Sequence, residues 1–295
     1  SALLFAAYAQ LPDGEIPLIN DSDTLDHSGM FEAGFRLFRD PALQWVSSRG
    51  AQGAPLPTPS RDFDGYLILS DSWGQDPASF ARRQHVFFDR APLGAGSHSH
   101  YDLLSLCWFA NGHPILVDPG RFTYDPEPDS AGIDWRGAFK STAFHNTVEI
   151  DGKDQTRYRS KSKTPPPGVA RYDKSRHTAN HGPDVEIRGA AHHIGDYGDW
   201  AMATAASHEY RPLHTRAVVF LRRQYLVAFD HIDTVDGEEH AAVLRFHLAA
   251  RWQRRVQFSA TSRWAIARTD DWDIHTAMSG QGEAEMQDGW VSTSY

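Results

Sequence analysis

Short apolar runs separated by polar turns dominate the first half of the chain. Tyr66–Leu69 and Val86–Phe88 are two such runs. Leu103–Ala110 leads through Asn111-Gly112, a dipeptide typical of hairpin turns, into the apolar run Ile115–Val117. The length of these runs and the turns that bound them predict β-strands.

Longer strand patterns fill the second half of the chain. Four long runs follow one another with short turns between them: Trp200–Tyr210, Thr215–Leu221, Tyr225–Ile232 and His240–Leu248. Because helical patterns do not alternate with these runs, a parallel α/β sheet is not expected. The pattern predicts an all-β fold, a large antiparallel β-sandwich built of several sheets.

The N-terminal end has a different pattern. Ser1–Gln10 is predicted to be the tail of a helix that ends at the turn Pro12-Asp13-Gly14. After Asp40, almost all of the chain is expected to form strands and turns. The first eight residues are apolar, but they are too few to span a membrane and lack the basic flank of a signal peptide, so no membrane insertion is expected.

Charge is unevenly distributed along the chain. The net charge of −9 argues against a general binder of polyanions, nucleic acids included. Between Arg136 and Arg176, however, there are ten Lys or Arg and four Asp or Glu, a balance of +6. This segment could attract an acidic ligand or form a solvated loop, and composition leaves both open. Cys107 is the only cysteine, which excludes an intrachain disulfide but not export.

Two histidines in the segment Gly94–Asp102 offer metal-binding chemistry. His98 and His100 are two positions apart, so on an extended strand their imidazoles would point to the same face. Zinc binds His nitrogen and Asp oxygen, usually through four ligands. Since His-x-His pairs also occur by chance, the pair alone is weak evidence for a metal site.

Two further residues could complete such a site. Asp118 ends the apolar run Ile115–Val117, and a carboxylate at the end of a buried strand needs a partner. His145 precedes another strand pattern, Val148–Ile150. Asp118 could instead cap the turn at Pro119-Gly120, and His145 could be a core histidine held by hydrogen bonds.

Several motifs in one order give the sequence a strong resemblance to the heparinase II/III family of polysaccharide lyases. Residues 96–105 resemble the signature GHxHxDxLS of that family, and residues 116–120 followed by Tyr124 resemble LVDPG…Y. Trp135-Arg136, Ser141-Thr142 and the run 145–152 with Gln155 resemble wR…S…HNTVxVDGxxQ. The resemblance extends from about Leu11 to the end of the chain.

The resemblance implies roles for the histidines that their spacing leaves open. It implies that His98 is the active-site histidine. It further implies that His100, Asp118 and His145 bind Zn²⁺, with water as the fourth ligand, and that this zinc organises the β part beside the active site. Arg136 and Tyr124 become candidate substrate-binding residues, with a structural ion pair and a core aromatic as their alternatives.

The resemblance also implies a domain organisation and a reaction. Residues 1–30 would be the end of an α/α toroid, and residues 31–295 would be the heparinase II/III-like β-sandwich domain. The expected reaction is β-elimination on an acidic, uronic-acid-containing polysaccharide such as alginate, heparin, heparan sulfate or a bacterial exopolysaccharide. A Tyr and a His or Asn on the missing N-terminal toroid would carry the acid–base chemistry, and the protein is expected in the periplasm or outside the cell.

Two other functions fit parts of the pattern. A cupin-like metalloenzyme also places His-x-His on a strand, but no glutamate follows His100 at the expected distance, since Asp102 is too near and Asp118 too far. A non-catalytic carbohydrate-binding or scaffold protein of a polysaccharide assembly cluster would share the family motifs. The presence of the toroid Tyr and His or Asn separates this last alternative from a lyase.

Overall fold

The fold is that of a computed structural model of the 295-residue chain. The structure describes residues 2–93, 98–125, 127–156, 185–221, 225–252, 255–268, 273–280 and 282–287, and also the backbone of 159–160 and 178–179. Among the described residues, no helix has the length and hydropathy needed to cross a membrane.

A five-stranded antiparallel sheet with the strand order β1-β2-β3-β4-β5 lies at the centre of the fold. Its strands are β1 (Arg61–Phe63), β2 (Tyr66–Ser70), β3 (His85–Asp89), β4 (Leu106–Ala110) and β5 (His113–Leu116). This sheet is buried on both faces, which explains why β2 and β3 are apolar at consecutive positions rather than alternating.

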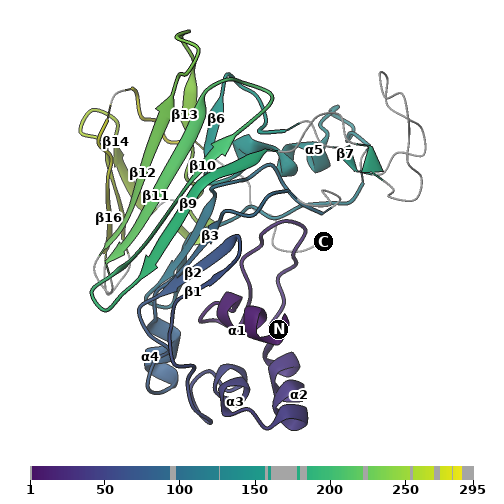
Figure 1. The fold of residues 1–295 in the computed structure, drawn as a ribbon, viewed down its shortest axis with the longest axis vertical. Helices are drawn as coiled ribbons and strands as arrows, with labels where there is room; N and C mark the ends of the chain where they lie inside the picture. The colour runs from purple at the N-terminus through teal and green to yellow at the C-terminus, as the bar shows by residue number, and fades with distance from the viewer. Residues whose placement is uncertain are drawn as a thin grey trace.

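Three N-terminal helices cover one face of this sheet. They are α1 (Ala2–Ala9), α2 (Ser28–Phe38) and α3 (Pro41–Ser47), drawn in purple to indigo below the sheet in Figure 1. Ile68 of β2 and Phe87 of β3 pack in one cluster with Tyr8, Phe31 and other helix residues. The N-terminal segment is therefore part of the core beneath the central sheet.

A second antiparallel sheet covers the other face. Its order is β12-β11-β10-β9, with β9 (Glu186–Ile194), β10 (Asp199–Ala206), β11 (Leu213–Leu221) and β12 (Tyr225–Asp233). Inward-facing residues such as Ala201, Val218 and Phe220 share a core cluster with Leu67 and Phe88 of the central sheet. Burial alternates along β10 and β11, as expected for strands with one face on the core.

Smaller elements complete the molecule. The strand β6 (Val148–Ile150) pairs with β13 (Ala242–Leu244), and a further sheet is formed by β14 (Val256–Ser259), β15 (Trp264–Arg268) and β16 (Asp273–Ala277). Strands β7 (Arg159–Ser160) and β8 (Thr178–Ala179) pair with each other. The short helices are α4 (Pro77–Arg82), α5 (Trp135–Lys140), and the 3₁₀ turns η1 (Thr142–Phe144) and η2 (Ala250–Trp252).

The predicted all-β, multi-sheet antiparallel sandwich is confirmed. The expectation that almost everything after Asp40 forms strands or turns is wrong for α3, α4 and α5. These helices are only six or seven residues long, and each has an Asp at its N-cap that accepts a backbone hydrogen bond. The proposed boundary at residue 30 falls inside α2 and stays a prediction.

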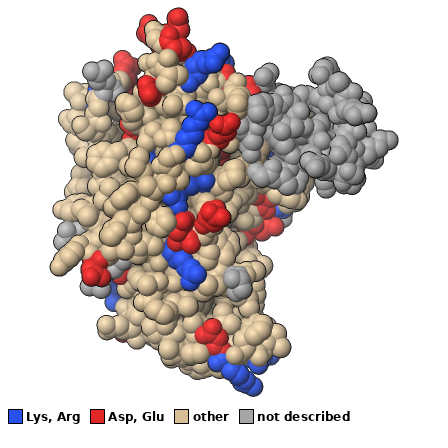
Figure 2. Space-filling view, in the orientation of Figure 1, with Lys and Arg blue, Asp and Glu red and all other residues tan. Residues whose placement is uncertain are grey.

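Figure 2 shows how charge is spread over one face of the molecule. Among the coloured residues, basic and acidic side chains are interspersed along a band rather than separated into a basic surface and an acidic surface. The two signs are therefore mixed on this face, as is common for a solvated protein surface.

Candidate functional site

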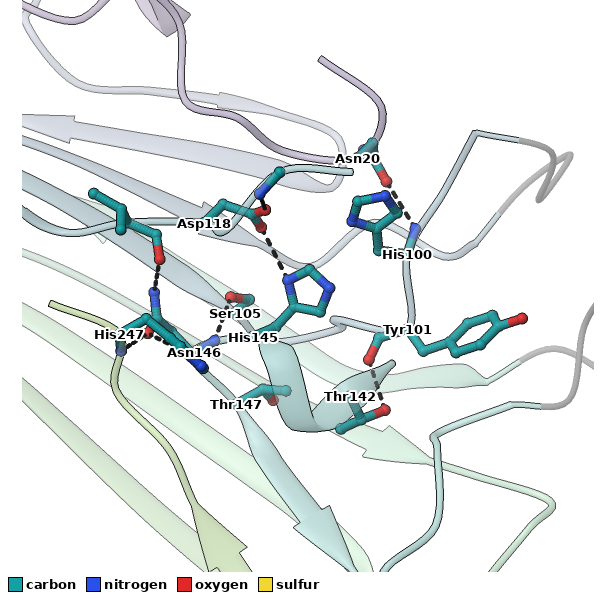
Figure 3. A network of polar contacts seen from close by, with 12 residues as sticks. Asn20, His100, Tyr101, Ser105, Asp118, Thr142, His145, Asn146, Thr147 and His247 are labelled. Carbon is teal, nitrogen blue, oxygen red and sulfur yellow. Dashed lines mark hydrogen bonds and ion pairs between the residues drawn. The ribbon is translucent and has the colours of Figure 1, made fainter. Parts of the chain in front are cut away.

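Three loops meet at one end of the central sheet and carry the predicted site residues. They are the loop before β4, the loop after β5 and the turn between η1 and β6. Asn146 holds them together, because its Nδ2 donates to the carbonyl oxygens of Leu106 and Val117 at 2.8 Å each. Its Oδ1 accepts from the backbone N–H of His247 at 2.6 Å, so a fourth segment joins the same point (Figure 3).

The strand geometry considered for His98 and His100 does not apply. Both lie outside any strand, in the loop between β3 and β4. They still reach the same residue: His98 Nδ1 is 2.8 Å from Asp21 Oδ2, and His100 Nε2 is 3.2 Å from Asp21 Oδ1. Their exposure differs sharply, at 67% for the side chain of His98 and 0% for that of His100. His98 is therefore accessible and His100 is enclosed. The sequence spacing of the two histidines did not predict this difference.

His100 and His145 face each other in the buried part of the site (Figure 3). Their ring centroids are 5.1 Å apart. Each ring uses one nitrogen on a carboxylate: His100 Nε2 contacts Asp21, and His145 Nδ1 lies 3.1 Å from Asp118 Oδ2. The other nitrogens, His100 Nδ1 and His145 Nε2, are buried and have no hydrogen-bond partner among the described residues.

A carboxylate oxygen lies beside these two nitrogens. Asp102 Oδ2 is also buried without a hydrogen-bond partner in the described part of the chain. Three potential metal-ligand atoms, one from each of His100, Asp102 and His145, lie within 4.8 Å of one another. Unpartnered buried polar atoms are costly, and two imidazoles with a carboxylate are donors that zinc accepts. The residues present therefore fit a zinc ion.

Asp118 has two geometric roles open to it. Its Oδ1 accepts from the backbone N–H of Gly120 at 2.9 Å, which is the turn-capping contact, and its Oδ2 contacts His145. The 3.1 Å contact to His145 Nδ1 is a hydrogen bond without metal. It is also close to the spacing of two donor atoms that share one zinc ion, about 3.3 Å for bonds of about 2.0 Å in a tetrahedron.

The exposed side of the site gathers the other predicted residues. The ring of Tyr124, 54% exposed, lies edge-on to His98 with centroids 6.1 Å apart. Two guanidinium carbons lie over the same ring, Arg121 Cζ at 3.8 Å and Arg136 Cζ at 5.2 Å from its centroid. His98, Tyr124 and Arg136 are thus brought together, with Arg121 as a basic neighbour that sequence reasoning did not single out.

Known proteins share both the sequence pattern and the fold of this arrangement. The family described as "Heparinase II/III-like, C-terminal" matches residues 57–295. The chain belongs to the heparinase II/III-like family. The predicted resemblance is confirmed, and it favours a lyase-type protein over the cupin-like alternative. No curated protein matches the chain.

Solved structures share the fold of this heparinase II/III-like chain. The Heparinase III-BT4657 gene product matches with a TM-score of 0.78 and 18% identity, over 99% of this chain and 41% of that protein. Heparan sulfate lyase HepC from Pedobacter heparinus matches with a TM-score of 0.70 and 18% identity, over 91% of this chain and 37% of that protein. The chain therefore spans about two fifths of the length of these structures.

The two imidazoles of the heparinase II/III-like site differ in their proton affinity. Burial lowers the pKa of His100 below its usual value, although the hydrogen bond to Asp21 opposes this. Burial also acts to lower the pKa of His145, but the charge and the hydrogen bond of Asp118 outweigh it and raise the pKa. Burial raises the pKa of Asp102. Zinc bound at these donors would favour their deprotonated forms.

Arg136 is largely occupied by an ion pair. Its Nη1 and Nη2 lie 2.5 and 2.8 Å from the two oxygens of Asp21, and its side chain is 12% exposed. This is the structural ion pair that the sequence left open as the alternative to substrate binding. Seven of the ten basic side chains between Arg136 and Arg176 lie outside the described residues, so the expectation that this segment borders an acidic ligand stays a prediction.

Asp21 and Asp102 are the residues that sequence reasoning missed. Asp102 stands in the signature around His98 and His100, so its proximity to the metal site was available from the motif. Asp21 lies 77 positions before His98 and outside every family motif. No periodicity or spacing could have paired the two.

Proposed function

We propose that this chain is the zinc-binding β part of a polysaccharide lyase that cleaves a uronic-acid-containing polysaccharide by β-elimination. The observation that carries the proposal is the arrangement of His98 within a heparinase II/III-like fold. His98 is exposed, has its Nδ1 engaged by Asp21, and lies beside Tyr124 and two guanidinium groups. An acidic sugar chain fits such a site because guanidinium groups match carboxylates in geometry and charge.

The chemistry of the reaction assigns work to these groups. In β-elimination the C5 proton of the uronide leaves to a base, the glycosidic C4–O bond breaks, and the leaving oxygen gains a proton. With Nδ1–H on Asp21, neutral His98 presents the Nε2 lone pair to substrate, where it can take up the C5 proton, and once protonated there it can donate to the uronate carboxylate. Tyr124, the exposed neighbour of His98, would contact the sugar at that nitrogen, and the nearby charges of Arg121 and Arg136 would favour an acidic sugar.

The proposal includes a missing partner, the N-terminal α/α toroid. Its support is that the chain spans about two fifths of the solved heparinase structures it matches. The toroid would supply the Tyr and the His or Asn that the family resemblance implies. Because acidic polysaccharides of this kind lie outside the cytoplasm, we also place the protein in the periplasm or outside the cell.

The reaction class is tested by its product. A protein joining the toroid to this chain is expected to release unsaturated uronide from heparan sulfate, alginate or a bacterial exopolysaccharide, because β-elimination leaves a C4–C5 double bond. The ultraviolet absorbance of that double bond is the measurement, with a neutral glucan as the control substrate. Release of saturated reducing ends without absorbance would assign the protein to hydrolysis, and binding without any cleavage would favour the carbohydrate-binding alternative.

The same proposal places zinc on His100, Asp118 and His145, with Asp102 at the edge of the ligand set. The support for His100 and His145 is that each has a buried ring nitrogen without a described partner, close to Asp102. The support for Asp118 is its contact with His145 and the family motif that it stands in. The three loops that carry these residues would be tied together by the ion, so zinc would act by stabilising the end of the sheet below His98.

Removal of a zinc ligand is expected to abolish stoichiometric binding. Wild-type chain prepared without chelators should carry about one zinc per chain, and His145→Ala should carry almost none, because a three-donor site loses a ligand from its enclosed side. Asp118→Asn should weaken binding more than Asp102→Asn. Metal analysis with a competing chelator makes the comparison. A larger loss in Asp102→Asn would put Asp102 in the place of Asp118, and full occupancy in His145→Ala would contradict the site.

A further inference from the structure

One carboxylate links the buried metal site to the exposed histidine. Asp21 lies in the segment between α1 and α2, and its side chain is only 4% exposed. His98 and Arg136 donate to its Oδ2 at 2.8 Å each, while His100 and Arg136 lie 3.2 and 2.5 Å from its Oδ1. Both oxygens thus accept hydrogen bonds from three side chains, two from the loop between β3 and β4 and one from α5.

The backbone around Asp21 is itself fixed to the site. Asn20 takes φ 56°, a left-handed conformation that Asn tolerates better than most residues. Its Oδ1 accepts from the backbone N–H of His100 at 3.1 Å (Figure 3). Arg121 Nη1 donates to the carbonyl oxygen of Asp21 at 3.2 Å. The turn is therefore tied to the loop before β4, which carries both histidines, and to the loop after β5, which carries Arg121.

The contact with His100 decides which nitrogen of that ring is available to a metal. A carboxylate accepts a hydrogen bond from Nε2–H, so Nδ1 keeps its lone pair, and Nδ1 is the buried nitrogen without a described partner. Carboxylate–histidine–metal arrangements of this kind fix the tautomer and the ring orientation of a ligand.

The contact of Asp21 with His98 fixes the tautomer of that exposed ring in the same way. Nδ1 donates to Asp21, so Nε2 is the nitrogen that faces substrate. Arg136 pairs with the same carboxylate through both of its terminal nitrogens, which keeps Asp21 ionised while it accepts from both histidines. Burial opposes ionisation of Asp21, but the hydrogen bonds from His100, Arg136 and His98 and the charge of Arg136 outweigh it, and the pKa lies below its usual value of 3.8.

We propose that Asp21 is a positioning residue that sets the tautomer and orientation of His100 for zinc and of His98 for substrate at the same time. Arg136 then acts first as the counter-ion of Asp21. The inference rests on the proposed function, because it assigns Asp21 to the zinc and substrate sites proposed above. It makes the segment before α2 a part of the active site, although that segment lies outside the matched family region.

The first test is the zinc affinity of the 295-residue chain. Asp21→Asn keeps the shape of the side chain but loses its charge, so zinc should bind about 10–100-fold more weakly, the scale of a lost carboxylate partner of a ligating histidine. Asp21→Glu should recover part of the affinity. Asp23→Asn is the matched control, because Asp23 is 55% exposed and pairs with Arg121 alone among the described contacts. Competition with a chelator gives the constants, and circular dichroism of the metal-free proteins checks folding.

The second test needs no metal and distinguishes positioning from general stability. Long-range ¹⁵N–¹H spectra of the imidazoles in metal-free wild type should give an Nε2–H tautomer for His100 and an Nδ1–H tautomer for His98. Both should change in Asp21→Asn while Asp23→Asn keeps the wild-type pattern. Equal zinc affinity in wild type and folded Asp21→Asn, or unchanged tautomers, would overturn the inference. A wild type that binds no zinc but has these tautomers would instead contradict the proposed zinc site and leave Asp21 in place.

Discussion

Isolated from a toroid, the 295-residue chain is expected to fold and bind zinc yet to release almost no unsaturated uronide from any acidic polysaccharide. His98 alone can act on one side of the sugar, but β-elimination also requires a group that protonates the leaving oxygen. The family resemblance places that group on the toroid. Positioning of substrate between two halves of a cleft is lost as well, and that effect alone can amount to several orders of magnitude in rate.

In the protein that joins the toroid to this chain, His98→Ala should lower the rate of uronide release by about 10²-fold or more. That is the scale of one lost acid–base or electrostatic contact. The expected loss is mainly in kcat, because the contact of Nε2 with the reacting uronate strengthens in the transition state. Absorbance of the double bond in alginate, heparan sulfate and exopolysaccharide digests measures the rate.

A matched control is available on the second sheet. His193 is exposed on β9, and His193→Ala should leave the rate unchanged. Robust turnover by the isolated chain would mean that the acid and base both lie within it, and the assignment of catalytic residues would then be wrong. Wild-type rates in His98→Ala would remove His98 from the mechanism while leaving the zinc site intact.

The sequence predicted the strands well where local pattern determines them. The clearest cases are two pairs of strands. Burial on both faces makes consecutive positions apolar in β2 and β3, and burial on one face makes apolar and polar positions alternate in β10 and β11. The short helices were not predicted, because six or seven residues contain too few turns to show a helical period. Asp40-Pro41 and Asp76-Pro77, an N-cap followed by Pro at the first helical position, were the signals that could have revealed α3 and α4.

The candidate site was predictable only as far as its motifs extend. His98, Tyr124 and Arg136 were proposed from family motifs, and the structure brings them together. What pairs with them was not predictable, because Asp21 is separated from Arg136 by 115 positions. Such pairing depends on how α1 and α2 pack beneath the central sheet, and this packing cannot be predicted from local sequence patterns.

Arg216 on β11 is expected to contribute strongly to the stability of the fold through a buried ion pair. Its side chain is 0% exposed, and its Nε and Nη2 lie 2.8 and 3.2 Å from the two oxygens of Asp230 on β12. Its Nη1 donates to the carbonyl oxygens of Leu104, at 2.7 Å, and of Asn146. His214 completes the group, with Nε2 2.7 Å from Asp230.

Arg216→Met should lower the free energy of unfolding by about 3 kcal/mol. Removal of one partner from a buried pair leaves an uncompensated charge, which costs about 3–5 kcal/mol, and Asp230, at 13% exposure, keeps enough solvent contact to favour the lower end. The two carbonyl oxygens also lose their donor. Since one of them belongs to Asn146, next to His145, the same variant should weaken zinc binding. Denaturant unfolding of the metal-free chain measures the stability.

The control lies on the same sheet. Arg188 on β9 makes a comparable two-nitrogen pair with Glu186, at 2.8 and 3.3 Å, but the side chains are 57% and 51% exposed. Arg188→Met should therefore change the free energy of unfolding by at most about 1 kcal/mol. Asp230→Asn combined with Arg216→Met should cost less than the sum of the two single changes, because the second change removes the charge that the first left unpaired. Equal losses of unfolding free energy in Arg188→Met and Arg216→Met would contradict this prediction, and so would strict additivity in the double variant. Either result would mean that burial does not make the Arg216 pair more stabilising than an exposed pair.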